Sequence, residues 1–395
     1  MHHIKISLRI YLPFLFAAFL ISLSLLGCAG ITGNSAIQPT TSPKSTFIYV
    51  GQMAAASGIV TSTANTDALT SYKIQIHGSL KRLGAFDAST LPGGIVDYAA
   101  SRPWVFTCDA RPVCQEFRAD TSGNLMVGAD ISSFGLHHVA AIDPSGNWLV
   151  ASSMQGEQVF RIQADGTLLP GPHTLPPLPP PPIPPDFMDF SIVAFDPTGK
   201  FVLAVDPVFI VDMPGGFGFD SATGIFTRAS VNFQLAEQGF HFMGFTPDGL
   251  HALGVQKTDT GSGDIEVLDW NPNNGSLNFH SKANLAINDV PDFFPSSLAM
   301  AGNLIFVQGG STQNVVLHFD PSTGAISDTG ERFPNESVNG TMRVDERTHT
   351  LVVTSPGNNL IGVWKYDPVT GTTSAVPGSP FPSGQTPEII GMFSQ

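Results

Sequence analysis

The stretch SIVAFDPTGKFVLA at residues 191–204 decides the fold of this chain. It holds a short apolar run, a turn containing Asp196, Pro197 and Gly199, and a second apolar run that starts at Phe201. Proline presets the first turn angle and glycine accepts a positive φ, so the pattern predicts two antiparallel strands joined by a tight turn. Comparable segments are HHVAAIDPSGN, HFMGFTPDGL, SSLAMAGN and GTMRVDERTH, which start at residues 137, 241, 296 and 340.

Two markers repeat seven times along the chain. Apolar runs begin at residues 47, 104, 148, 201, 251, 304 and 350, and turn glycines follow at 78, 123, 166, 224, 275, 324 and 371. Successive glycines are 43 to 58 residues apart, close to the length of a four-stranded propeller blade. Stretches such as QVFRIQA and VVLHFD alternate with the period of two that strands require. We therefore predict an all-β fold, a seven-bladed β-propeller of four-stranded antiparallel blades over residues 47–395; an eight-bladed ring or two stacked sandwiches are the alternatives.

The two ends of the repeat region complement each other. The first repeat lacks a leading strand, whereas the last runs past its turn into PEIIGMF at residues 387–393. A C-terminal strand that pairs with the N-terminal blade would remove a free sheet edge from the ring. We expect this pairing to close the propeller.

Residues 1–27 have the pattern of an export signal, with Lys5 and Arg9 ahead of an apolar run. The end of the run, LLGC at residues 25–28, resembles the bacterial lipobox, which implies cleavage before Cys28 and a lipid on its thiol. An ordinary signal peptide with a chance cysteine is the alternative. Ala29 follows instead of aspartate, and the resemblance then favours the outer membrane, facing the periplasm or the cell surface. Residues 28–46 are rich in Gly, Ser, Thr and Pro and are predicted to be a flexible tether.

Cys108 and Cys114 are the other cysteines of the chain, in the stretch CDARPVC. Their flanks have strand character, so the two thiols should face each other across a hairpin. An exported protein meets an oxidising compartment, and we expect a disulfide. Two unpaired thiols are the alternative, and a zinc site lacks a second Cys/His pair at the right spacing.

Composition and missing motifs exclude several functions. The formal charge is −14, which argues against nucleic acid as a partner. No Gly-x-Ser-x-Gly or His-Glu-x-x-His motif is present, and we expect neither a metal nor another cofactor. The stretch PGGFGF at residues 214–219 lacks the Lys-Ser/Thr of a phosphate loop and is interpreted as a bend. Residues 170–185 hold ten prolines and are predicted to form an extended loop.

The repeats resemble those of the lactonase-type propellers, relatives of 6-phosphogluconolactonase and of carboxymuconate-cycling enzymes with YVTN-like repeats. The resemblance rests on FIYVG at residue 47, on the Asp-Pro-x-Gly turns, on DPSTG and DPVTG at 320 and 367, and on PGSPF at 377. It implies a site at the mouth of the central channel and chemistry on a lactone ring.

The residues that the resemblance maps onto the lactonase site are mostly altered. The family's Pro-His motif, five residues ahead of the turn aspartate, corresponds to His138, while the acid expected after the next strand is replaced by Ser152 and Ser153. A later Gly-Pro-Arg-His motif, with a glutamate sixteen residues after the arginine, corresponds to GFHF at 239–242 and to Lys257. Here His241 lies at the arginine position and Lys257 at the glutamate position.

These replacements lead to two functional hypotheses. The first is an envelope-anchored lipoprotein that works as a binding or scaffolding module with a degenerate lactonase site, taking a small lactone, a sugar acid or a protein ligand at the channel. The alternative is an active lactone hydrolase in which His138 is the base or orienting group, and His241 and Lys257 steady the carboxylate.

Overall fold

A computed structural model describes residues 45–53, 67–75, 77–87, 95–101, 103–109, 113–153, 156–171, 192–205, 215–228, 240–257, 263–283, 295–309, 313–334 and 340–394. The predicted signal peptide, Cys28 and the tether up to residue 44 lie outside the described residues, as do residues 172–185 of the proline-rich loop. Contacts group Ser45–Gln395 into one unit. Within the described ranges there is no helix of the length and hydropathy needed to cross a bilayer.

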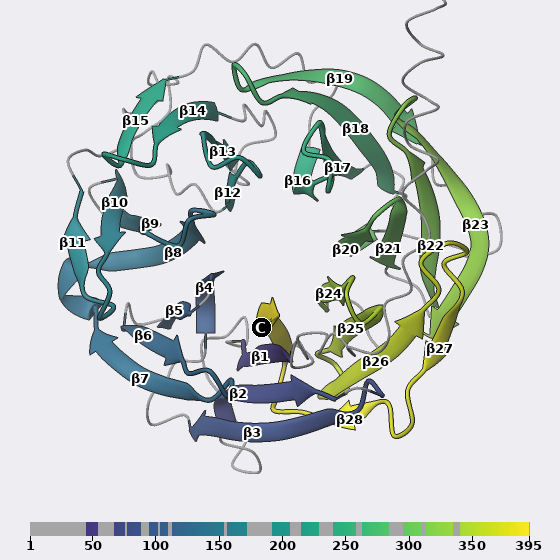
Figure 1. The fold of residues 1–395 in the computed structure, drawn as a ribbon, viewed down its shortest axis with the longest axis horizontal. Coiled ribbons are helices and arrows are strands. Elements are labelled where there is room, and N and C mark those ends of the chain that lie inside the picture. Colours follow the sequence, from purple (N-terminus) through teal and green to yellow (C-terminus); the bar gives the residue numbers. More distant parts are fainter. Residues whose placement is uncertain are drawn as a thin grey trace, which may run out of the picture. The chain divides into compact units, whose positions relative to one another are not determined.

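Seven antiparallel sheets, the blades, form a ring in this unit (Figure 1). The strands of each blade are given from the innermost strand outward. Blades 1 to 3 consist of β29 (Pro387–Ser394), β1 (Thr46–Gln52), β2 (Asp67–Ile74) and β3 (Leu80–Asp87); β4 (Ile95–Ser101), β5 (Trp104–Asp109), β6 (Cys114–Ala119) and β7 (Leu125–Asp130); β8 (Leu136–Ile142), β9 (Trp148–Ser153), β10 (Gly156–Ile162) and β11 (Leu168–Pro170). Blades 4 and 5 consist of β12 (Ile192–Phe195), β13 (Phe201–Val205), β14 (Gly215–Asp220) and β15 (Ile225–Arg228); β16 (Phe240–Phe245), β17 (His251–Lys257), β18 (Gly263–Asn271) and β19 (Ser276–Ala283). Blades 6 and 7 consist of β20 (Pro295–Ala301), β21 (Leu304–Gly309), β22 (Gln313–Asp320) and β23 (Ala325–Pro334); β24 (Met342–Asp345), β25 (Thr350–Ser355), β26 (Leu360–Tyr366) and β27 (Thr373–Ala375), with β28 (Phe381–Pro382) also paired to β26. One 3-10 turn, η1 (Ser132–Phe134), connects blades 2 and 3.

The C-terminal strand closes the ring as predicted. β29 pairs with β1 in an antiparallel register that places Phe47 opposite Phe393 and Tyr49 opposite Gly391. Ile389 and Ile390 are buried at 0% and 3% exposure, so the strand contributes to the core as well as to the hydrogen-bonded ladder. The prediction of a seven-bladed propeller with shared terminal strands is confirmed.

The core consists of apolar layers between neighbouring blades. Successive side chains of a strand point to opposite faces of the sheet, so the second strand of each blade contributes side chains to the apolar layers on both sides of that blade. In β9, Leu149 packs in the cluster shared with blade 2, whereas Val150 packs in the cluster shared with blade 4. Seven such clusters, one between each pair of adjacent blades, account for the apolar runs that repeat in the sequence.

The turn aspartates are buried hydrogen-bond acceptors. Asp143 Oδ1 accepts the backbone N–H groups of Asn147 at 2.8 Å and Trp148 at 2.7 Å. Asp196 repeats this arrangement with Lys200 at 2.9 Å and Phe201 at 2.8 Å. Each carboxylate therefore satisfies the N–H groups that start the following strand, which explains why aspartate opens the repeated turn.

The repeated glycines contact the preceding blade. A Cβ on Gly123, in the outer turn of blade 2, would overlap the ring of Phe47, which lies in β1 of blade 1. Gly224 of blade 4 has the same relation to Trp148 of blade 3. Both glycines have positive φ angles, +84° and +74°, so they meet a conformational and a steric requirement together. At these two blade interfaces, a turn glycine of one blade therefore packs against the aromatic residue that begins the apolar run of the preceding blade.

One expectation about the strands was wrong. The described part of this stretch, GGFGF at residues 215–219, forms most of β14, in which Gly215 and Gly216 pair with Ala204 and Leu203 of β13. Phe217 and Phe219 are buried in the cluster between blades 3 and 4. Tertiary packing of these two phenylalanines overrides the low strand propensity of the neighbouring glycines Gly215, Gly216 and Gly218.

Candidate functional site

His138 lies near the start of β8, the innermost strand of blade 3. The register places it opposite Ser152 of β9. Ser152 and Ser153 are the last two residues of β9, at the place where the lactonase resemblance calls for an acid. The residue paired with His138 therefore carries a hydroxyl and no carboxyl group.

His241 and Lys257 lie together on blade 5. His241 is the second residue of the innermost strand β16 and pairs with Val255, and Lys257 ends β17 opposite Gly263. Blade 4 separates this blade from the one that carries His138. The side chains of the three residues lie outside the described part of the chain, so their joint participation in one site stays a prediction.

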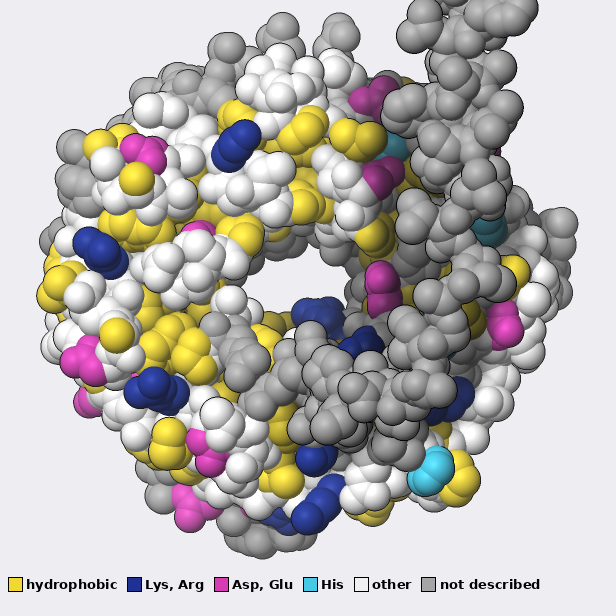
Figure 2. Space-filling model, viewed as in Figure 1, with side chains coloured by type: hydrophobic (Ala, Val, Ile, Leu, Met, Phe, Trp, Pro, Cys, Tyr) yellow, Lys and Arg dark blue, Asp and Glu magenta, His cyan; other side chains and the backbone are white. Residues whose placement is uncertain are grey.

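Four neighbouring innermost strands line a pocket of about 390 Å³ in the channel. The strands are β24, β29, β4 and β8, which belong to blades 7, 1, 2 and 3. Apolar side chains on the wall include Ala141 and Ile142 of β8 and Met392 and Phe393 of β29. Figure 2 shows the opening at the centre of the ring, with basic side chains on part of its wall.

Tyr98 and Arg343 give this pocket its polar side chains. The Tyr98 hydroxyl donates a hydrogen bond of 2.6 Å to Glu388 Oε1, which joins β4 to the start of β29. Burial raises the pKa of the Tyr98 phenol, the Glu388 carboxylate raises it further, and the Arg343 guanidinium opposes the shift. Tyr98 therefore stays protonated and serves as a donor to Glu388 at any physiological pH.

The pocket and His138 occupy different levels of the channel. On β8, the pocket is lined by Ala141 and Ile142 at the end of the strand, three and four residues after His138. At about 3.3 Å per residue this corresponds to roughly 10–13 Å along the strand. The pocket is thus separate from the positions that the lactonase resemblance maps on β8.

The sequence did not single out Tyr98, Arg343 or Glu388. They lie on the three strands β4, β24 and β29, and Tyr98 and Glu388 are 290 positions apart in the chain. The available signals were an arginine inside the short strand MRVD and a glutamate in the surplus C-terminal segment. Neither residue belongs to a spaced motif.

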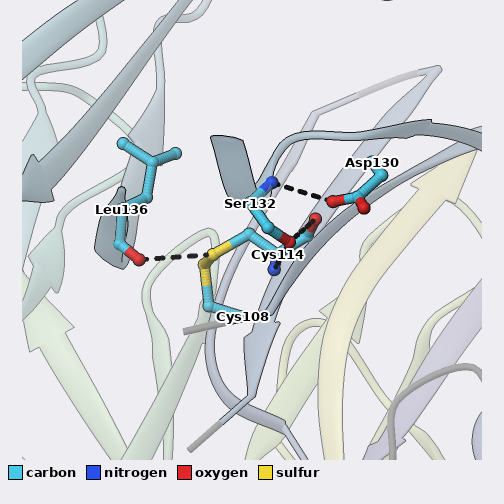
Figure 3. The surroundings of a disulfide bond; sticks show 5 residues. All are labelled: Cys108, Cys114, Asp130, Ser132 and Leu136. Atoms are coloured by element: carbon cyan, nitrogen blue, oxygen red, sulfur yellow. Dashed lines mark hydrogen bonds between the residues drawn. A yellow bond between two sulfur atoms is a disulfide. The ribbon is translucent and has the colours of Figure 1, made fainter. Parts of the chain in front are cut away.

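The predicted disulfide joins Cys108 and Cys114. The two residues are direct partners in the register of β5 and β6, and both are fully buried between blades 2 and 3. Figure 3 shows the surroundings, in which the Cys114 N–H donates to Ser132 Oγ at 2.9 Å and the Ser132 N–H donates to Asp130 Oδ1 at 2.9 Å. The disulfide anchors the hairpin of blade 2 beside the connection to blade 3.

Among the described residues, no group of three or more His, Cys, Asp or Glu side chains is placed to hold a metal ion. The pocket wall offers a guanidinium and a phenol, and the phenol is hydrogen-bonded to the neighbouring Glu388 carboxylate.

The fold defined by these features is that of the lactonase-type seven-bladed propellers, which confirms the resemblance at the level of fold. A candidate 6-phosphogluconolactonase from Bacteroides fragilis superposes with a TM-score of 0.65 at 15% identity, covering 90% of this chain and 99% of its own. The periplasmic gluconolactonase of Pseudomonas aeruginosa superposes with a TM-score of 0.61 at 16% identity, covering 88% of this chain and 99% of its own. No protein-family model and no curated protein matches the sequence.

Proposed function

We propose that this chain is a lipid-anchored propeller of the bacterial envelope that binds a small ligand in its channel and has lost efficient lactonase chemistry. The observation that carries the proposal is the replacement of the expected catalytic groups. In the register of blade 3, His138 pairs with Ser152 where the resemblance calls for an acid. In blade 5, His241 and Lys257 occupy the positions expected for an arginine and a glutamate.

The replacement changes what the site can do. An arginine and a glutamate together clamp a carboxylate and move a proton. Lysine is a cation that only donates hydrogen bonds, so at neutral pH it cannot replace a glutamate carboxylate as a base. A channel with these residues retains groups that can hold an anion, while the mapped residues that could transfer a proton at neutral pH are the histidines His138 and His241 and include no carboxylate.

The proposed anchor rests on the lipobox-like sequence ahead of Cys28 and on the tether that precedes Ser45, where the propeller unit begins. A lipid on Cys28 would hold the propeller close to the membrane while the tether allows it to move. Mass spectrometry of the membrane fraction should find acylated Cys28. A Cys28→Ala variant that stays in the membrane fraction to the same extent would contradict the anchor.

Turnover distinguishes binding from catalysis. The mature chain carrying Cys28→Ala would be incubated with glucono-1,5-lactone, 6-phosphogluconolactone and muconolactone, and hydrolysis would be followed by proton release. We expect no rate above the buffer reaction. Turnover that is lost in both His138→Ala and His241→Ala would overturn the proposal, and a Val369→Ala variant at an exposed position is the control.

The same assay tests the second hypothesis, an active lactone hydrolase. The match of His138 to the family histidine and the structural similarity to a gluconolactonase favour it. In that case His138 would act as base or orienting group, and His241 with Lys257 would steady the carboxylate that forms when the ring opens.

A further inference from the structure

We propose that His280 forms a pH-dependent link between blades 5 and 6, which is complete when its ring carries two protons and weaker when the ring carries one. The inference concerns the scaffold of the propeller and does not depend on what the channel binds. It rests on the contacts of this histidine at the interface of the two blades and on a comparison with the interface of blades 3 and 4.

His280 lies on β19, the outermost strand of blade 5, and its two ring nitrogens have acceptors on different elements. Nδ1 lies 2.7 Å from Oδ1 of Asp269 on the neighbouring strand β18. Nε2 lies 2.8 Å from the carbonyl oxygen of Thr323, in the outer turn of blade 6. Carboxylate and carbonyl oxygens only accept hydrogen bonds, and a neutral imidazole has a single N–H group. Both contacts are therefore hydrogen bonds only in the imidazolium form.

The outer turn of blade 6 packs directly on this ring. A Cβ on Gly324 would overlap Cδ2 and Nε2 of His280, so the turn and the imidazole are in close contact. The hydroxyl of Ser281, the next residue of β19, donates a hydrogen bond of 3.0 Å to the Gly324 carbonyl. This second contact does not titrate near neutral pH. Loss of a proton from His280 should therefore weaken the interface without separating the two blades.

The interface of blades 3 and 4 has a similar contact with a donor that does not titrate. The indole N–H of Trp148 donates a hydrogen bond of 2.8 Å to the carbonyl of Ser221, in the outer turn of blade 4. A Cβ on Gly224 of that turn would overlap the indole ring. The indole N–H is a donor only and keeps its proton. At the interface of blades 5 and 6 the ring donor is a histidine, whose proton count changes near neutral pH.

A second histidine and two carboxylates lie on the blade 5 side of this contact. The ring of His251 on β17 meets that of His280 at right angles, with centroids 5.9 Å apart. His251 Nε2 lies 3.6 Å from Oδ1 of Asp269, and its Nδ1 lies 3.6 Å from Oδ2 of Asp248. The two histidines therefore share Asp269, and the closer of the two to that carboxylate is His280.

The direction of the pH dependence follows from the same contacts. The hydrogen bond to the Thr323 carbonyl and the contact with Asp269 raise the pKa of His280 above its usual value of 6.5, while burial opposes the shift. Such a group stabilises the fold fully below its unfolded-state pKa, and this stabilisation is lost as the pH rises through the folded-state pKa. Hydrogen bonds from Ser322 and Thr323 lower the pKa of Asp320, in the same turn, to about 2, so it stays ionised throughout.

The experiment is hydrogen–deuterium exchange of the mature chain carrying Cys28→Ala, from pH 5.5 to 8.5, corrected for the intrinsic exchange rate. The turn at residues 320–324 reports the link, and the turn at 220–224 is the internal control. In each turn the glycine N–H donates to the carbonyl of the first aspartate, at 2.8 and 2.7 Å. We expect protection of the first turn relative to the second to fall at least about twofold as the pH rises. A constant ratio would overturn the proposal.

Exchange at the imidazole carbon between the two nitrogens measures the pKa of His280 in the unmodified sequence around it. We expect a midpoint above 6.5, the usual value for histidine. A midpoint at or below this value would overturn the proposal. Because this measurement changes neither blade 5 nor blade 6, it holds even where a substitution at the interface prevents folding.

Variants assign the effect to the two partners. His280→Phe keeps an aromatic ring against the turn and removes the titrating group, so the protection ratio should no longer depend on pH. Asp269→Asn keeps an acceptor and removes the charge, so the fall should occur at lower pH. The matched control His77→Phe, at an exposed turn of blade 1, should behave as the wild type. A pH dependence that persists in His280→Phe would assign it to another group such as His251, and an unchanged midpoint in Asp269→Asn would exclude the carboxylate; either result would overturn the proposal.

Discussion

Blades 1 and 2 are neighbours in the ring but are assembled in opposite ways. Blade 1 takes its innermost strand from residues 387–394 and its other strands from residues 46–87, so its inner pair joins the two ends of the propeller. Blade 2 is continuous from residue 95 to 130, and a disulfide links its two middle strands. The difference shows two ways to stabilise a sheet: long-range pairing that closes the whole ring, and a local covalent link that acts within one hairpin.

The largest expected effect comes from removing the closing strand. Deletion of residues 387–395 takes Ile389 and Ile390 out of the core and exposes the edge of β1. Each buried isoleucine contributes about 2–5 kcal/mol, so the free energy of unfolding should fall by more than about 5 kcal/mol. Urea denaturation followed by fluorescence measures the loss. A midpoint equal to that of the full chain would contradict closure by β29, and Val369→Ala, at an 82% exposed position, is the control.

The joint between blades 1 and 2 should be the next most sensitive. Gly123→Ala forces a Cβ into the ring of Phe47 at a φ of +84°. The strained backbone and the overlap together should lower stability by about 2–4 kcal/mol. Gly302→Ala is the matched control, because its φ is also positive, at +53°, and nothing lies within 4 Å of the added Cβ. Equal losses for the two variants would show that packing on Phe47 does not matter.

Removal of the disulfide tests the local link of blade 2. The double variant Cys108→Ala/Cys114→Ala frees a short loop, and the chain-entropy relation gives a loss of about 2 kcal/mol. The ring should remain closed, because the disulfide lies within one hairpin and does not connect the termini. Thermal unfolding of the variant and of the wild type, each with and without reductant, measures this. Sensitivity of the variant itself to reductant would mean that another thiol chemistry is responsible.

The smallest expected effect is the pH-dependent contribution of Asp345 to stability. This residue ends β24 of blade 7 and accepts a hydrogen bond from Thr46, the first residue of β1 in blade 1. Burial alone would raise the pKa of the Asp345 carboxyl, but hydrogen bonds from Thr46 and Thr348 and the nearby Arg347 outweigh it and lower the pKa. A carboxyl whose pKa is lower in the folded state stabilises the fold at pH values above its unfolded-state pKa, near 3.8. This stabilisation disappears as the pH falls through the folded-state pKa.

Asp345→Asn should therefore cost on the order of 1 kcal/mol at pH 7 and progressively less below about pH 4. Denaturant titrations of wild type and variant at pH 7, 5 and 3 give the difference. The disulfide of blade 2 carries no titratable group, so the loss in the double alanine variant should keep its size across this range. A loss in Asp345→Asn that does not shrink at low pH would contradict the assignment to the carboxylate.

Most of the fold followed from local pattern. The Asp-Pro-x-Gly turns predicted antiparallel pairs because aspartate, proline and glycine each meet a local backbone requirement, and Asp196 meets it with hydrogen bonds to the next strand. The stretch that forms β14 was misjudged because Phe217 and Phe219 are stabilised by packing against blade 3, which local strand propensity does not include.

The site was predicted less completely. His138 and His241 lie on the innermost strands β8 and β16, and Lys257 lies at the end of the second strand β17, but their participation in one site stays a prediction. The cluster of Tyr98, Glu388 and Arg343 was not predicted, since no periodic pattern marks residues that only a closed ring brings together.

By itself, the sequence determined the number of blades, the exchange of the terminal strand and the pairing of Cys108 with Cys114, because each depends on period, turn chemistry or short spacing. Only the tertiary structure decided which side chains share the channel pocket. Ring closure places β24, β29, β4 and β8 side by side, and the contacts that result join residues hundreds of positions apart. Such contacts depend on the geometry of the whole ring, which no local segment encodes.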